Sequence, residues 1–276
     1  MARYNRKTPP RGWEEPIDHW AAWLTAQGLR PSTIRVKKNH IVFFARCNPD
    51  LQPHDLTVEA VLDWAATRAW KPETRHGNYG SFSQFMTWLQ GKKITFPAVR
   101  RPRTLARPVP DEVIEGFLHG PDARACLAIR LAAYAGLRCC EIPLTNTADL
   151  IDGIGGRSVL VHGKGGHERL VPLSQRLDAA IRDYQADHGI EQGWLFPGGT
   201  HGHLGADRIG KMVNDQLPKP WTLHGLRHRF ATAVYRATRD IIVVQQLLGH
   251  ASVATTQRYL AFTDDSLRAA VNLADH

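Results

Sequence analysis

A segment rich in proline and arginine constrains the fold of this chain more than any other feature. Residues 97–110 contain four prolines, four arginines and no acidic residue. Because proline lacks the amide hydrogen that helices and central strands need, this segment predicts neither a helix nor a packed strand. The 276 residues are enough for two compact domains. We therefore expect domains at 1–97 and 111–276, joined by a linker at 98–110, with a C-terminal tail at 260–276.

The excess positive charge lies before the second domain. Residues 1–110 hold 18 Lys and Arg against 8 Asp and Glu, a net charge of +10. Residues 111–276 hold 17 against 18, a net charge of −1. A basic module joined to a nearly neutral one indicates binding to a polyanion such as double-stranded DNA, the alternative being a solvated basic face.

The first domain is predicted to be a bundle of four short helices. The apolar residues of the first helix recur at steps of four, three and four, which is one face of a helix. Prolines or a capping threonine open the other three. Their aromatic stripes predict a packed core rather than stacking on bases. The first face is Trp13, Ile17, Trp20 and Leu24, and the later helices begin at Pro31, near Thr57 and after Pro72.

Basic and polar side chains of this first part are candidates for DNA contacts. Arginines of the linker could lie along phosphates as it crosses a duplex, the alternative being a solvated tether. Polar residues of the second and fourth helices could reach a groove. The linker candidates are Arg100, Arg101 and Arg103, and the groove candidates are Lys38, Arg75 and Asn78.

The second domain is predicted to be mostly helical with one β-hairpin. Helical periodicity runs from Asp111 to about Gly136 and resumes at Ser174. Between them, residues 157–162 and 167–172 flank a Gly-Lys-Gly-Gly turn, which is typical of a hairpin. The predicted fold class is therefore mostly α with a small β-hairpin or sheet.

Six polar residues of the second domain lie at junctions between predicted elements. Each alone has an ordinary explanation, such as a local ion pair, a solvated turn or half-buried packing. Six together, in one order and each in a distinctive local sequence, indicate a functional site. They are Arg138 in Gly-Leu-Arg-Cys-Cys-Glu, Lys164 in the hairpin turn, His224 and Arg227 in His-Gly-Leu-Arg-His, His250 in Leu-Leu-Gly-His, and Tyr259 in Thr-Thr-Gln-Arg-Tyr.

The order and local sequences of these six residues resemble those of tyrosine recombinases, the family of phage integrases and Xer-type resolution enzymes. The resemblance covers the whole second domain, and the helical bundle before it is similar to the family's SAM-like core-binding domain. It implies a site-specific recombinase that cleaves and rejoins DNA through a 3′-phosphotyrosine on Tyr259, with no metal, other cofactor or ATP. Integration or excision of a phage or mobile element is the expected use, with Xer-like dimer resolution as an alternative.

This residue set suits phosphodiester exchange. The transition state carries extra negative charge, which Arg138 and Arg227 can hold because a guanidinium is planar and always charged. His224 and His250 can add hydrogen bonds and assist removal of the tyrosine proton. The resemblance gives protonation of the leaving 5′-oxygen to the hairpin lysine, Lys164.

Supporting features extend the expectation. Glu141, close after Arg138, is expected to orient that arginine. The resemblance implies a homotetramer on two DNA core sites, and it leaves open an accessory protein that sets direction. The tail residues Asp264–Leu273 have a helix-start signal and an apolar stripe that could pack on a neighbouring protomer, or on its own domain.

Two departures from the family pattern refine the expectation. Ala261 occupies a position where the family often has a histidine. The predicted bundle begins by about Trp13, which leaves no room for the arm-binding domain of some integrases. A simple recombinase acting on short core sites is therefore expected.

Other classes are less favoured. The cysteines have no metal-type spacing and the histidines match no structural zinc set, so no metal site is expected. No secretory signal or membrane span is apparent, which predicts a cytoplasmic, nucleoid-associated protein of a bacterium or a phage-infected host. A type IB topoisomerase and a non-catalytic DNA-binding regulator remain the alternatives.

Overall fold

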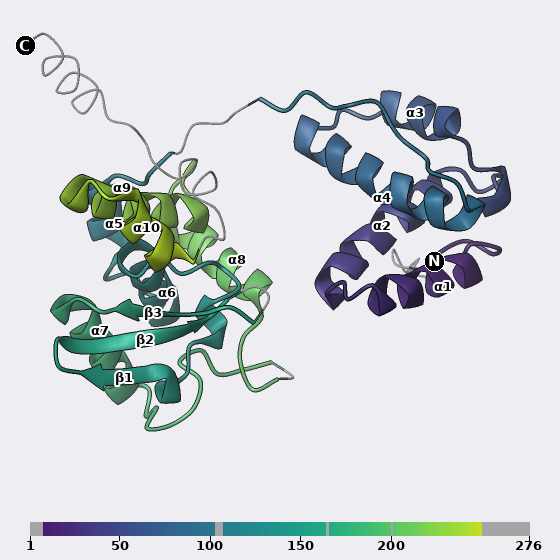
Figure 1. Cartoon of the computed structure of the whole chain (residues 1–276). Helices are drawn as coiled ribbons and strands as arrows, with labels where there is room; N and C mark the ends of the chain where they lie inside the picture. Colours follow the sequence, from purple (N-terminus) through teal and green to yellow (C-terminus); the bar gives the residue numbers. More distant parts are fainter. Residues whose placement is uncertain (1–7, 103–106, 164–165, 200, 250–276) are drawn as a thin grey trace, which may run out of the picture. The chain divides into compact units, whose positions relative to one another are not determined.

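The computed structural model describes residues 8–102, 107–163, 166–199 and 201–249. The chain forms two compact units, Met1–Arg103 and Thr104–His276, each with its own core (Figure 1). The predicted fold class, mostly α with a small sheet, is confirmed. Among the described helices, none is long and apolar enough to cross a membrane.

Unit 1 is a bundle of helices that begin where the sequence predicts. Pro31 and Pro72 are the first residues of their helices, and the Thr57 hydroxyl accepts a hydrogen bond from the backbone N–H of Ala60 at 3.1 Å. Such caps satisfy amide groups that have no partner within the helix. The elements are α1 (Glu14–Ala26), α2 (Pro31–Cys47), the 3₁₀ helix η1 (Pro53–Asp55), α3 (Val58–Ala66) and α4 (Pro72–Gln90).

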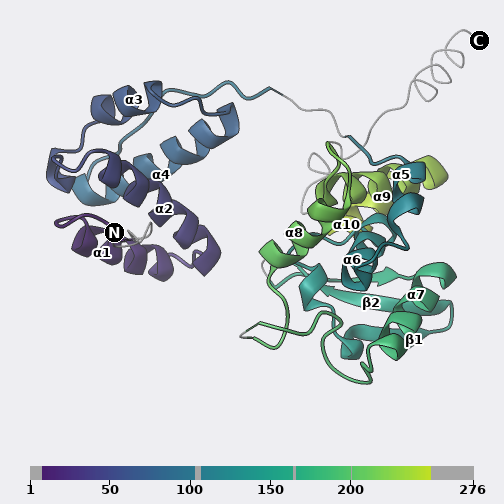
Figure 2. The same cartoon turned by 180° about the vertical axis from the view of Figure 1, so that it is seen from behind.

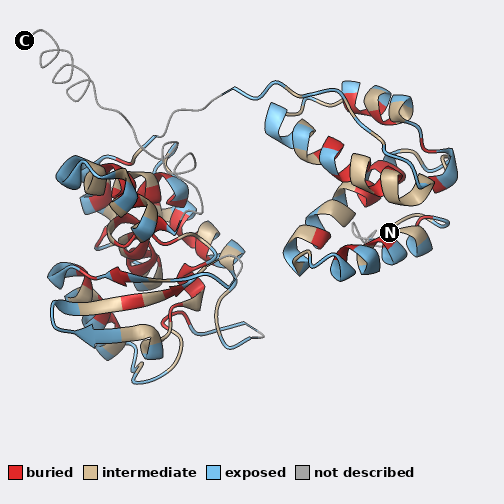
Figure 3. Cartoon of the chain, in the orientation of Figure 1, coloured by how far each residue is buried: buried red, intermediate tan, exposed pale blue. Residues whose placement is uncertain are grey.

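The predicted aromatic core of unit 1 is confirmed. All four residues of the first predicted face are fully buried. The rings of Trp20 and Phe85 meet edge to face with centroids 5.1 Å apart, and those of Phe44 and Phe82 do so at 5.2 Å. Such contacts stabilise a core beyond its area burial. Figure 3 shows the buried residues gathered on the facing sides of these helices.

The described linker residues have neither helix nor strand, as their prolines predict. However, the ordered cores extend into the predicted linker from both ends. Val99 packs against the core of unit 1. Val109 is buried in the core of unit 2, and its amide donates a hydrogen bond to the Gly225 carbonyl at 3.3 Å. The segment without core contacts is therefore shorter than residues 98–110.

Unit 2 contains a three-stranded antiparallel sheet in the order β1-β2-β3. The predicted hairpin is β2 and β3, with Val159 opposite Val171. The third strand, β1, was not predicted, because only its first residue is partly buried and its alternation is too short to read. The strands are β1 (Leu150–Gly153), β2 (Gly156–His162) and β3 (Glu168–Pro172), preceded by the 3₁₀ helices η2 (Ile142–Leu144) and η3 (Thr147–Asp149).

The helix α6 forms the centre of unit 2. Eight of its twelve residues are buried, which its many alanines permit because neighbouring helices can approach closely. It contacts α7, α8 and α9, while α7 covers one face of the sheet, lying behind it in Figure 1 and in front of it in Figure 2. The helices are α5 (Asp111–Phe117), α6 (Ala123–Tyr134), α7 (Gln175–Asp187), α8 (Ala206–Gln216), α9 (Leu223–Thr238) and α10 (Ile241–Leu248).

Candidate active site

A glycine turn at the end of α6 sets the direction of Arg138. Gly136 has a φ of +66°, and a Cβ atom there would lie 2.4 Å from a ring carbon of Phe230. A larger residue would therefore clash in addition to being strained. The chain leaves α6 through this glycine and enters a turn in which the backbone N–H of Glu141 donates to the Arg138 carbonyl at 2.8 Å.

The Glu141 carboxylate lies at the centre of the site, and its side chain is only 1% exposed. Its Oε1 accepts a 2.6 Å hydrogen bond from Nη1 of Arg138, and its Oε2 accepts one from the backbone N–H of the same residue at 2.8 Å. Arg169 binds both oxygens, with Nη1 to Oε1 at 3.0 Å and Nη2 to Oε2 at 2.7 Å. Nη1 of Arg227 lies 3.7 Å from Oε2. One carboxylate thus contacts three arginines, whereas the sequence predicts contact with Arg138 alone.

The arginines keep Glu141 ionised. Burial by itself would raise the pKa of the carboxyl, but the hydrogen bonds and charge of Arg169, with those of Arg138, outweigh it and lower the pKa to about 2. At neutral pH the site therefore holds a negative charge surrounded by the positive charges of three arginines.

Carbonyl oxygens at the end of α10 hold the two predicted catalytic arginines. Arg227, which is 1% exposed, donates from Nη2 to the Leu248 carbonyl at 2.7 Å and from Nη1 to the Gly136 carbonyl. Arg138 donates from Nη2 to the Gly249 carbonyl at 3.2 Å. Helix C-termini leave such carbonyls without helical partners, so α10 presents acceptors to both guanidinium groups.

His224 lies one helical turn before Arg227 on α9. Partial burial, and then the positive charge of Arg227, lower the pKa of its imidazole. Its ring meets that of His228 edge to face, with centroids 4.5 Å apart. A neutral imidazole at this position can both donate and accept a hydrogen bond.

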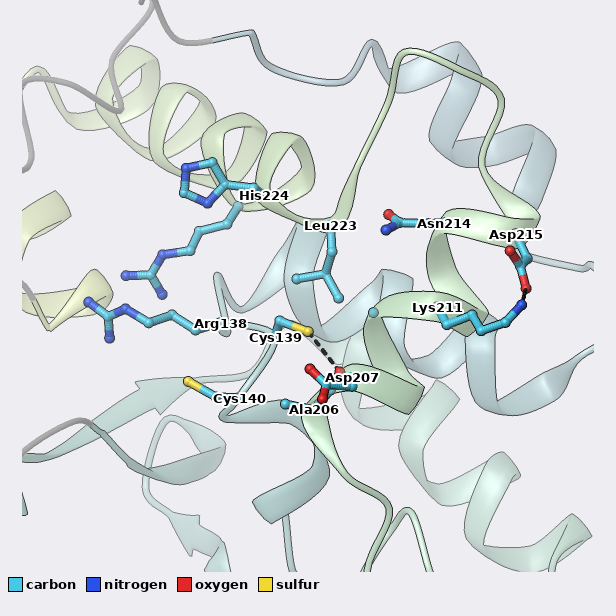
Figure 4. Close-up of a pocket in the computed structure, with 12 residues that line it drawn as sticks. Arg138, Cys139, Cys140, Ala206, Asp207, Lys211, Asn214, Asp215, Leu223 and His224 are labelled. Atoms are coloured by element: carbon cyan, nitrogen blue, oxygen red, sulfur yellow. Dashed lines mark hydrogen bonds and ion pairs between the residues drawn. The ribbon is translucent and has the colours of Figure 1, made fainter. Parts of the chain in front are cut away.

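An open cavity of about 890 Å³ brings these groups to one surface. Arg138, His224 and Arg227 line it together with residues of α8. In Figure 4, the side chains of Arg138 and His224 extend at one end of the cavity, and the Lys211–Asp215 ion pair of α8 lies at the other. The cationic end suits the binding of an anionic group such as a phosphate.

Four of the predicted site residues lie outside the described part of the chain. Two of these four directly follow residues that lie beside the cluster formed by Glu141 and its three arginines. A Cβ atom on Gly163 would lie 3.7 Å from Oε1 of Glu141. The Gly249 carbonyl accepts the hydrogen bond from Arg138. Gly163 and Gly249, the last described residues before Lys164 and His250, therefore both lie next to this cluster. The residues outside are Lys164, His250, Tyr259 and Arg103, as are those of the tail.

The groove prediction for Asn78 is wrong on this geometry. The residue is 3% exposed, and its Nδ2 donates to the Thr74 carbonyl at 2.9 Å. Its place beside Tyr79 on the inner face of α4 explains the burial. A groove contact by Asn78 would require the bundle to open.

The other candidates of unit 1 are at least partly accessible. Lys38 pairs with Asp18 at 2.8 Å, and its side chain is 32% exposed. Arg75 donates long hydrogen bonds, both 3.4 Å, to the Tyr79 hydroxyl and to a backbone carbonyl. Arg100 and Arg101 are exposed. These weak contacts leave the cations able to turn toward another anion.

Arg169 is a site residue outside the predicted set, although the sequence contains a signal for its burial. It alternates with the exposed Glu168 and Leu170 along β3 and therefore shares the inner face with Val171. A charged residue on the inner face of a strand requires a buried partner. In the described residues, no three His, Cys, Asp or Glu side chains lie together as a metal site.

Known proteins are similar to this chain over most of its length. The sequence profile of the phage integrase family matches residues 111–265. The tyrosine recombinase XerD of Caulobacter vibrioides is 31% identical over 255 residues, covering 79% of this chain and 80% of that protein. A putative integrase/recombinase of Sinorhizobium fredii is 35% identical over 173 residues, covering 59% and 67%. The crystal structure of a lambda integrase dimer bound to a core site has the same fold, with a TM-score of 0.69 at 18% identity over 90% of this chain and 76% of that one.

Proposed function

The chain belongs to the phage integrase family of tyrosine recombinases, and we propose that it exchanges DNA strands through a covalent 3′-phosphotyrosine on Tyr259. Site-specific recombination is the activity of the family. The observation that carries the residue assignment is the pair of arginines, Arg138 and Arg227, fixed by Glu141 and by the carbonyls of α10 at one end of an open cavity.

The proposed step balances without an external energy source. The phenolic oxygen of Tyr259 attacks phosphorus, forming a phosphorus–oxygen bond as the bond to the 5′-oxygen breaks. The tyrosine proton passes to a neutral histidine of the pair His224 and His250, and Lys164 gives a proton to the departing 5′-oxygen. One phosphoester bond forms for each that breaks, so a 5′-hydroxyl of a partner strand can reverse the step without ATP.

The arginines supply the main stabilisation of the transition state. Charge builds up on the two non-bridging oxygens as phosphorus becomes five-coordinate. Arg138 and Arg227 are held in place before the reaction, so they need no rearrangement when that charge appears. Glu141 does not itself stabilise negative charge on the phosphate. Its buried, ionised carboxylate instead fixes the two arginines that do. We propose that the reaction needs no metal ion for the same reason.

The predicted partners follow from this chemistry. Double-stranded DNA is the substrate, with the basic unit 1 and the linker supplying phosphate contacts. A full exchange joins two duplexes and requires four tyrosines, so we propose a homotetramer on paired core sites. An accessory protein that sets the direction of exchange is compatible with this scheme.

Integration or excision of a mobile element is the proposed biological use. The similarity to a putative integrase/recombinase supports it. Resolution of chromosome dimers is the second candidate, which the longer similarity to a protein named XerD favours. Sequencing of the recombination sites separates the two: an element junction supports integration, and a single chromosomal site supports resolution.

Covalent trapping tests the proposal directly. The protein is mixed with a pool of nicked, randomised duplexes in EDTA, and adducts are separated on a denaturing gel beside the Tyr259→Phe variant. We expect an adduct from the wild type alone, since the variant keeps its DNA contacts but has no phenolic oxygen. Tight binding without an adduct would instead favour a DNA-binding regulator, and an adduct from Tyr259→Phe would mean another nucleophile.

A further inference from the structure

Arg169 is a buried arginine that the proposed reaction does not yet use. Its side chain is 8% exposed, and it lies on β3 rather than on the elements that carry Arg138 and Arg227. It donates two hydrogen bonds to the Glu141 carboxylate and a third, from Nε, to the Leu247 carbonyl at 2.8 Å. These three hydrogen bonds therefore connect β3 to two other segments of unit 2, the turn at Glu141 and the end of α10.

These contacts lie at the two points where the chain leads into proposed catalytic residues. A Cβ atom on Gly163, the residue before Lys164, would lie 3.8 Å from Nη1 of Arg169. A Cβ atom on Gly249, the residue before His250, would lie 2.9 Å from Cδ of Arg169. At Gly249 a side chain would collide with Arg169, so the glycine allows this close approach, whereas the distance at Gly163 is an ordinary van der Waals contact.

The hairpin itself does not depend on Arg169. Backbone ladder bonds join β2 and β3, the Gly163 amide donates to the His167 carbonyl at 2.8 Å, and His162 bonds to Glu168 at 2.9 Å. Loss of Arg169 would leave these bonds in place. It would remove the ion pair that joins the end of the hairpin to Glu141.

We propose that Arg169 is a positioning residue, which fixes the β2–β3 hairpin and thus the proton donor at its tip against the Arg138–Glu141–Arg227 cluster. This inference rests on the proposed function. The arginines act on the non-bridging oxygens and the hairpin lysine on the leaving oxygen, so catalysis requires both at a fixed separation. Arg169 sets that separation through a rigid, bidentate pair with a carboxylate that also binds Arg138.

The test exploits a leaving group that needs no proton. A duplex recovered by covalent trapping is synthesised in two forms, one normal and one with sulfur in place of the bridging 5′-oxygen at the cleavage point. Thiols ionise near a pKa of about 8.5, far below alcohols, so the sulfur departs as a thiolate without a general acid. Adduct formation is timed for the wild type and for Arg169→Met, which keeps the length of the side chain but not its charge.

We expect Arg169→Met to be about 100-fold slower than the wild type on the normal duplex, the cost of a misplaced proton donor. On the sulfur duplex it should react within about threefold of the wild type, as Lys164→Ala should. Arg138→Ala should be slow on both, because its defect concerns the non-bridging oxygens. Equal slowness of Arg169→Met on both duplexes, or wild-type rates on both, would overturn the proposal.

Matched variants separate positioning from a general loss of structure. Arg157→Met removes an arginine of the neighbouring strand that pairs with Asp152 and Asp178, both at 3.3 Å, away from Glu141. It should keep wild-type rates on both duplexes. If Arg169→Met does not fold, Arg169→Lys replaces it, because lysine keeps the charge but not the bidentate geometry. The proposal then predicts that Arg169→Lys is slower than the wild type on the normal duplex but not on the sulfur duplex.

Failure of the proposed function gives a different result from failure of this inference. No adduct from the wild type on either duplex would contradict the recombinase chemistry itself. Wild-type cleavage with no sulfur rescue of Lys164→Ala would contradict the role of Lys164, and with it the positioning role of Arg169. Rescue of Lys164→Ala but not of Arg169→Met would contradict the positioning role alone.

Discussion

The cations of the two units are held in opposite ways. In unit 2, Arg138, Arg169 and Arg227 share one buried carboxylate and have little freedom to move. In unit 1 and the linker, Lys38 and Arg101 pair with exposed carboxylates at 2.8 and 3.5 Å. Buried ion pairs fix geometry at a cost in desolvation, whereas exposed ones contribute little and exchange partners readily.

This difference matches two different tasks. Charge that develops on two oxygens during a reaction is best stabilised by donors that are already in place. Attraction to a long, uniformly charged duplex needs only many cations near its surface. The contrast therefore predicts large, geometry-dependent effects in the cluster and small, additive, salt-dependent effects in the linker.

The largest effect is expected from Arg227→Ala. Loss of a preorganised donor to a developing oxyanion costs roughly 10²–10³ in rate, so cleavage of a trapped duplex should fall by at least that factor. DNA affinity should change far less, because one buried cation contributes little to long-range attraction. Single-turnover adduct formation and a binding titration measure the two quantities separately.

Arg229→Ala is the matched control for that variant. It lies two residues further along α9, where its Nε pairs with Asp111 at 2.6 Å and its guanidinium covers the ring of Tyr134. Cleavage by this variant should stay near the wild-type rate. A similar loss in both variants would mean that damage to α9, not loss of the donor, explains the effect of Arg227→Ala.

The second effect concerns stability and pH. The pKa of Glu141 is about 2 in the folded protein and near 4.5 when unperturbed. A lowered folded pKa means that the ionised carboxylate stabilises the fold above pH 4.5 and that this contribution is lost as the pH falls toward 2. The shift corresponds to a contribution of about 3 kcal/mol to the free energy of unfolding.

Urea unfolding at pH 5.5 and pH 3 measures this dependence. Glu141→Gln should be less stable than the wild type at pH 5.5, by a few kcal/mol, and should lose less stability on acidification. Asp178→Asn is the control, because Asp178 also binds two arginines but lies away from the cluster. If Glu141→Gln and the wild type lose equal stability between the two pH values, the carboxyl does not stabilise the fold in its ionised form.

The sequence predicts the local contacts of this cluster but not the distant ones. Glu141 follows Arg138 by three residues, so their contact depends only on a turn. Arg169 is 28 residues further along, and its contact depends on the register of a strand and on where β3 meets α10. No local pattern contains that information, and a predicted hairpin alone does not say which side chain faces the site.

The same limit explains the error in unit 1. The aromatic stripe of α4 is predicted correctly because large apolar residues recur with helical spacing. Asn78 lies next to Tyr79 and shares its burial, but its polar side chain suggests an outer position. Its Nδ2 donates to the carbonyl four residues earlier, which satisfies the amide nitrogen within the helix, whereas its amide oxygen is buried without a hydrogen-bond partner among the described residues.

The smallest effect is expected from the linker. Neutralising Arg100, Arg101 and Arg103 together should lower the slope of log affinity against log salt by roughly one unit for each phosphate that these arginines neutralise in the wild type. The rate of cleavage at saturating DNA should be unchanged, because none of the three is proposed to touch the reacting phosphate. A binding titration at several salt concentrations measures the slope.

A control with an equal change in net charge decides whether position or total charge matters. Arg124, Arg176 and Arg182 each pair with a carboxylate on the surface of unit 2, at 3.6, 2.8 and 2.9 Å. Neutralising these three should leave the salt slope unchanged if the linker lies along phosphates, because the slope counts the ions released where cations meet phosphates and not the overall charge. An equal fall in slope for both triple variants would mean that unit 1 and the linker act only through the net charge of the protein. The linker would then be a tether. Only the buried arginines of unit 2 would have a task that depends on their position, and the exposed cations of unit 1 and the linker would not.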